Sequence, residues 1–241
     1  MKLMRLLAAA AALGAATAAH AHGVWLADRA GALTVVYGVG PQDEAYRPDK
    51  VTRIEARAAD GTPLAAKLAA NGRNVIVEAP REAASFATTL DNGFWTKGPD
   101  GKFRNVRKSE VPDAQSASHT VKFNTHVRAS TGGAPKPFGL TLEIVPLVDV
   151  HPLTPGDELP VQVLFEGKPL KGAALFVDYV NDANTRGAKT DADGKATLKV
   201  RNDGLNVIGV AFSQPTPDDK DADKIGYFAT LSFVTAFVEN D

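Results

Sequence analysis

Turn-forming residues interrupt this chain roughly every 8–15 residues, and this spacing limits the possible folds more than any other feature of the sequence. Gly, Pro, Asp and Asn combine at these points, as in Asp60-Gly61, Pro155-Gly156 and Asp193-Gly194. The segments between the turns are rich in β-branched and aromatic residues. Short segments of this kind are typical of β-sandwiches rather than of units in which strands alternate with helices. The sequence therefore predicts an all-β fold.

The first 21 residues have the features of a secretory signal peptide. Lys2 and Arg5 precede an apolar run over residues 6–16, and small residues flank His20 in the exit Ala19-His20-Ala21. The run is too short to span a membrane. Cleavage after Ala21 would make His22 the first residue of a mature periplasmic protein.

A Gly- and Pro-rich stretch divides the remaining chain in two. Residues 131–139 predict a linker between an N-terminal β domain (22–130) and a C-terminal β-sandwich (140–241). Two segments of the second half, EGKPLKGA (166–173) and KTDADGKA (189–196), resemble transthyretin-like and other Ig-like sandwiches. We therefore expect two β-sandwich domains after the signal peptide.

Composition excludes several classes of site. The chain has no cysteine, so disulfides and Cys-based metal centres are excluded. Its formal net charge is −1, which gives no electrostatic reason to expect nucleic-acid binding. No second apolar run is long enough to span a bilayer, so we expect no membrane span in the mature chain.

An N-terminal histidine is a potential metal chelate. The free α-amino group and one imidazole nitrogen of His22 can bind a transition metal together. Cleavage after Ala19 would instead expose His20-Ala21-His22, whose nitrogens suit square-planar Cu²⁺ or Ni²⁺.

Two further histidines lie in a segment that alternates like a half-buried strand, residues 119–128 (HTVKFNTHVR). Counting by two places His119 on the apolar face with Phe123, and His126 on the polar face with Lys122. An inward-facing histidine can be a ligand or a hydrogen-bonded core residue. We take His22, His119 and His126 as candidate ligands, and expect His151, in a turn, to be solvated.

Catalytic motifs are absent from the sequence. It has no G-x-S-x-G elbow, no H-E-x-x-H and no Gly-rich phosphate loop, so we do not expect an enzyme. Trp95 lies beside an expected tight turn at Asp91-Asn92-Gly93, where it could line a ligand pocket with Trp25 and Tyr227 or pack under a loop.

Several short segments together resemble a bacterial periplasmic family of unknown function that is often labelled a nickel/cobalt uptake transporter component. They include HGVWL (22–26), YGVG (37–40), LEIVPL (142–147), PGDELPV (155–161) and FATLSF (228–233). The resemblance implies a two-part β protein of the periplasm associated with divalent-metal uptake.

The expected function is therefore periplasmic binding of Ni²⁺ or Co²⁺, with Cu²⁺ as a further possibility, and delivery of the ion to a membrane permease. Two alternatives stay open. One is a copper oxidase with an N-terminal histidine, similar to polysaccharide monooxygenases. The other is a metal-free Ig-like module that binds carbohydrate or protein.

Overall fold

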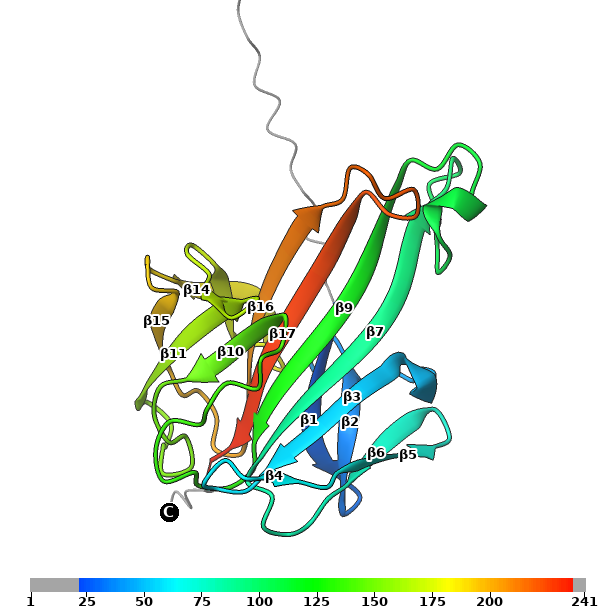
Figure 1. The fold of residues 1–241 in the computed structure, drawn as a ribbon. Helices are drawn as coiled ribbons and strands as arrows, with labels where there is room; N and C mark the ends of the chain where they lie inside the picture. The colour runs from blue at the N-terminus through cyan, green and yellow to red at the C-terminus, as the bar shows by residue number, and fades with distance from the viewer. Residues whose placement is uncertain (1–21, 236–241) are drawn as a thin grey trace, which may run out of the picture.

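The computed structural model describes residues 22–235, which consist almost entirely of β-strands (Figure 1). The predicted all-β class is confirmed. Helical structure in this part of the chain is limited to two short 3-10 turns, η1 (Pro48–Lys50) and η2 (Lys108–Glu110). No helix within residues 22–235 is long and apolar enough to cross a membrane. The predicted signal peptide lies outside the described residues.

Two smaller sheets flank a long one. The first has the order β1-β2-β6-β5 and is formed by β1 (Gly23–Arg29), β2 (Ala32–Gly38), β6 (Asn74–Glu78) and β5 (Lys67–Asn71). The second joins β10 (Leu142–Pro146), β11 (Glu158–Phe165) and β12 (Lys168–Pro169), with β15 (Lys195–Lys199) paired to β11.

The long sheet has nine strands, in the order β14-β13-β16-β17-β9-β7-β3-β4 with β8 paired to β7. Its members are β14 (Asp182–Lys189), β13 (Ala174–Asp178), β16 (Leu205–Pro215), β17 (Lys224–Val234), β9 (Ser116–Val127), β7 (Ser85–Lys97), β3 (Val51–Arg57), β4 (Pro63–Leu64) and β8 (Phe103–Arg104).

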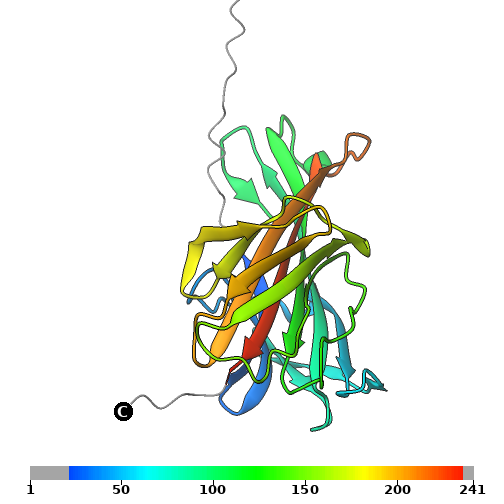
Figure 2. The same cartoon turned by 90° about the vertical axis from the view of Figure 1, so that its left-hand side faces the viewer.

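This sheet crosses the boundary that the sequence placed at residues 131–139. β9, from the first half, pairs in parallel with β17, from the second half, over ten residue pairs from Lys224↔Ser118 to Phe233↔Val127. In the turned view the red strand β17 lies between orange β16 and green β9 (Figure 2). The two predicted halves thus share one sheet.

The C-terminal end of the expected linker is hydrogen-bonded to strand β10. The buried carboxylate of Glu143 accepts hydrogen bonds from the backbone N–H groups of Phe138 (2.7 Å), Gly139 (3.0 Å) and Leu140 (3.2 Å). Burial raises the pKa of Glu143 even though these three donors favour the charged form.

Hydrophobic cores lie on both faces of the long sheet. On one face Phe123 and Val127 of β9 pack in a core with Leu142 and Ile144 of β10. On the other face the β1–β2 hairpin buries its side chains against β3, β7, β16 and β17. The central strands are therefore covered on both sides. The alternation of apolar and polar residues along them does not show which side chains face solvent, because neither face does.

β1 is an edge strand of its own sheet, and its outer backbone edge rests on the long sheet. The N–H of Leu26 donates to Oδ1 of Asn124 at 3.1 Å, and the Thr230 hydroxyl donates to the carbonyl of Val24. Asn124 and Thr230 have no solvent exposure. Because these buried side chains satisfy the backbone of β1, they fix where the start of the described chain lies.

Candidate metal centre

His22 immediately precedes β1, and two neighbours hold its ring. Nε2 of His22 lies 2.9 Å from Oε1 of Glu44. The imidazole stacks on the Tyr37 ring, with centroids 4.9 Å apart and planes inclined by 10°. The His22 side chain is 34% exposed and that of Glu44 43%, so the pair is open to solvent on one side.

The segment after β2 brings Glu44 back over this ring. The Glu44 N–H donates to the carbonyl of Tyr37 at 2.8 Å. Gly38 makes the tight path possible, because a Cβ atom there would stand 1.9 Å from the carbonyl oxygen of Gln42. The loop can therefore close only with glycine at this position.

Beside His22 the surface is hollowed into an open groove of about 460 Å³. Its lining includes Glu44 and Gln42 from the segment after β2, and Asn181, Asp182 and Asn184 at or just before the start of β14. Hydrogen bonds from Thr185 lower the pKa of Asp182. The groove therefore presents carboxylate and amide oxygens next to an imidazole, which is a set of groups suited to a cation.

Two buried phenols lie beneath this end of β1. Burial raises the pKa of Tyr37 to about 12, with the charge of Glu44 adding to the effect. Burial likewise raises the pKa of Tyr179, whose hydroxyl donates to the Gly38 carbonyl at 3.4 Å. Both phenols thus stay protonated at neutral pH, and the neutral ring of Tyr37 is the one that stacks on His22.

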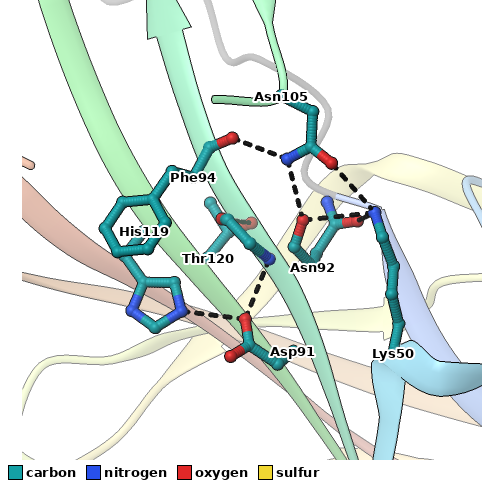
Figure 3. A network of polar contacts seen from close by, with 8 residues as sticks. Lys50, Asp91, Asn92, Phe94, Asn105, His119 and Thr120 are labelled. Atoms are coloured by element: carbon teal, nitrogen blue, oxygen red, sulfur yellow. Dashed lines mark hydrogen bonds and ion pairs between the residues drawn. The ribbon is translucent and has the colours of Figure 1, made fainter. Parts of the chain in front are cut away.

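His119 lies in a separate polar network (Figure 3). Its Nε2 is 2.8 Å from Oδ1 of Asp91, and its ring stacks on Phe94 with centroids 4.6 Å apart. Its side chain is 24% exposed, so it lies at the rim of the sheet face rather than inside the core.

The tight turn expected at Asp91-Asn92-Gly93 is instead a bulge inside β7. The register with β9 shifts between Asp91 and Gly93, and Gly93 has a φ of 77°. The Gly93 N–H donates to Oδ1 of Asp91 at 2.8 Å. The bulge directs Asp91 to His119, while Asn92 accepts a 2.8 Å hydrogen bond from Nζ of Lys50 (Figure 3).

His126 was expected to face water, and this is wrong. It is 2% exposed, because the β1–β2 hairpin covers that face of β9. Nδ1 lies 2.9 Å from the Ser232 hydroxyl. Burial, together with the charge of Arg128, lowers the pKa of His126 to about 3, so the ring is a neutral core residue.

Lys122, which the alternation placed on the polar face with His126, is also buried. It is 4% exposed, with Nζ 5.8 Å from the centroid of the Phe228 ring, and burial lowers its pKa to about 8. No carboxylate within residues 22–235 forms an ion pair with it.

The three candidate aromatic residues do not share one surface. Trp25 is 1% exposed and packs between β1 and the long sheet, whereas Tyr227 packs in the core on the opposite face. Trp95 is half-buried in β7. The ring of Trp25 is therefore not accessible to a substrate.

His151 is exposed in a turn, as expected.

The candidate ligands thus form two pairs, His22 with Glu44 and His119 with Asp91, while His126 is enclosed. No group of three or more His, Asp or Glu side chains within residues 22–235 is arranged to hold a metal ion. Glu44 was missed because it lies 22 residues after His22, and no local spacing links the two.

Comparison with known proteins gives a family but no activity. Residues 19–214 match a family model described as "Domain of unknown function (DUF4198)". The chain is also similar to an uncharacterized protein of Haemophilus influenzae, with 26% identity over 226 residues that cover 93% of this chain and 95% of that protein. No solved structure matches. The matched region includes His22, Glu44 and the β7 bulge.

Proposed function

We propose that this chain, which belongs to the DUF4198 family of unknown function, is exported to the periplasm and captures a divalent transition-metal ion at its mature N-terminus. The contact between His22 and Glu44 carries the proposal. Cleavage after Ala21 would add a free α-amino group to an imidazole that a carboxylate already orients.

The proposed role is capture and transfer of the ion to a membrane permease, and not catalysis. The ring of His22 is one-third exposed beside an open groove, so an ion bound there would keep positions free for exchange. Nitrogen ligands suit Ni²⁺, Co²⁺ and Cu²⁺, and the expected order of affinity places Cu²⁺ highest. The resemblance to nickel/cobalt uptake components favours Ni²⁺ or Co²⁺ as the physiological cargo.

His119 is not needed for this site, because Asp91 and Phe94 already hold its ring. We therefore restrict the proposed protein ligands to His22 and its α-amino nitrogen. Water molecules would occupy the remaining coordination positions of the ion.

The test begins with the intact mass of the exported protein, which should correspond to a start at His22. That protein should bind one Ni²⁺ or Cu²⁺ in a calorimetric titration. His22→Ala should weaken binding at least 100-fold, and His151→Ala, which changes an exposed turn, should leave it unchanged. A different start, or full affinity in His22→Ala, would contradict the proposed N-terminal site. Failure of the wild-type protein to bind either ion would favour the metal-free binding module.

A further inference from the structure

We infer that Glu44 is a positioning residue, which holds Nε2–H of His22 so that Nδ1 and the α-amino nitrogen take the metal ion together. This inference rests on the proposed function and deepens it. It assigns a role to each of the two ring nitrogens and places Glu44 outside the set of ligands.

The chemistry of the contact decides which ring nitrogen is free. A carboxylate can only accept hydrogen bonds, so a 2.9 Å contact between Nε2 of His22 and Oε1 of Glu44 requires the proton on Nε2. The neutral imidazole then carries its lone pair on Nδ1. Nδ1 is also the nitrogen closer to the backbone, and with the α-amino nitrogen it closes a six-membered chelate ring around a metal.

The ring is held before any metal arrives. Tyr37 is only 7% exposed, and it lies parallel to the imidazole at a centroid distance of 4.9 Å. The backbone hydrogen bond from Glu44 to Tyr37 places the stacking ring and the carboxylate on one rigid segment. Binding therefore costs little side-chain entropy at His22.

The start of β1 is held equally firmly. A Cβ atom at Gly23 would stand 2.8 Å from the Tyr179 ring, so the backbone here lies directly against that ring. One and three residues further on, at Val24 and Leu26, the contacts with Thr230 and Asn124 fix the register of the strand. The α-amino nitrogen of a chain that starts at His22 is thus located by the same fold that orients the imidazole.

The two roles of Glu44 give different results on substitution. Glu44→Gln keeps an oxygen that accepts from Nε2–H, but its neutral amide is a poor metal ligand. Glu44→Leu removes the acceptor altogether. Binding of Cu²⁺ and Ni²⁺ to protein that starts at His22 should fall less than fivefold in Glu44→Gln and about 10–100-fold in Glu44→Leu.

The chain offers a matched control. Glu55 forms an ion pair with Arg53, and its side chain has the same 43% exposure as that of Glu44. Glu55→Gln and Glu55→Leu should leave metal affinity unchanged. The electron paramagnetic resonance spectrum of bound Cu²⁺ should be the same in wild type and Glu44→Gln. An equal loss of affinity in Glu44→Gln and Glu44→Leu, with a changed spectrum, would show that Glu44 is a ligand and overturn the inference.

A second measurement separates this inference from the proposed function. In metal-free protein, ¹⁵N shifts of the His22 ring should report a proton on Nε2 and none on Nδ1, and Glu44→Leu should give a mixture of tautomers. A proton on Nδ1 in the wild type would overturn the inference even if metal binds. Failure to bind any metal, with the Nε2–H form present, would instead overturn the proposed function.

Discussion

At the residue scale, β9 carries two ionisable side chains on the face that β1 covers. Lys122 is 4% exposed and His126 is 2% exposed. Their alternation with Phe123 and Val127 correctly predicted that these two pairs of residues lie on opposite faces of β9. The sequence could not show that both faces are covered, because the covering strand, β1, lies about 100 positions earlier in the chain. Burial acts on the two groups in the same direction, since it disfavours the charged form of each.

Lys122→Met should stabilise the protein at pH 7. Burial lowers the pKa of Lys122 from 10.5 to about 8, so the folded protein holds a charge at a cost of about 3 kcal/mol at neutral pH. Between pH 8 and 10.5 the unfolded chain binds more protons, and wild-type stability rises. Urea unfolding should therefore show an advantage for Lys122→Met at pH 7 that shrinks toward pH 10. An equal loss of stability at both pH values would contradict this account.

His126 should make the protein acid-sensitive. Its pKa falls from 6.5 to about 3 on folding, so the unfolded chain gains a proton first as the pH drops. Stability is thus lost progressively from about pH 6.5 toward pH 3. In urea unfolding, His126→Leu should flatten this slope, at the cost of its hydrogen bond with Ser232. The surface variant His151→Leu is the control, and a wild-type slope in His126→Leu would assign the acid sensitivity to other groups.

At the element scale, the position of the candidate site depends on how β1 rests on the long sheet. The residues of β1 were considered only as part of the family resemblance, as HGVWL (22–26), and through Trp25 as a candidate pocket residue, while His22 just before the strand was the candidate chelate. Its location follows from hydrogen bonds to Asn124 and Thr230, over 98 and 206 positions. The bulge in β7 was likewise taken for a turn, because Asp-Asn-Gly fits both a tight turn and a bulge with positive φ at glycine.

Asn124→Leu should loosen β1 selectively. It leaves the buried N–H of Leu26 without an acceptor, which costs about 1–3 kcal/mol. Hydrogen exchange at Leu26 and its neighbours in β1 should accelerate more than exchange in β10, on the opposite face. Asn184→Leu, at an exposed position of β14, is the matched control. Uniform acceleration throughout the molecule would mean that Asn124 supports the whole sheet and not β1 in particular.

At the scale of the whole molecule, one sheet joins both halves of the chain. Turn spacing was enough to predict the all-β class. The sharing of a sheet could not be read from the sequence, because the parallel pair β9–β17 joins segments about 106 positions apart. A Gly- and Pro-rich stretch marks a loop equally well between two domains and between two strands of one domain.

A fragment comprising residues 140–241 should therefore fail to fold alone. Its strand β17 would lose the β9 partner, and its core would lose Phe123 and Val127. Circular dichroism and urea titration of this fragment should show no cooperative transition, whereas the chain from His22 onward should unfold in a single step. A folded fragment would restore the view that the C-terminal part is an independent sandwich.

The central claim, that the mature N-terminus is the metal site, is tested most directly by moving the α-amino group. Protein that starts at His22 and protein with Gly-Ser added before His22 should be titrated side by side with Ni²⁺ and Cu²⁺. The extension keeps the imidazole, Glu44 and the fold, but separates the amine from Nδ1. We expect the affinity to fall at least 100-fold while the thermal unfolding temperature stays the same. Equal affinity of the two proteins would contradict the claim.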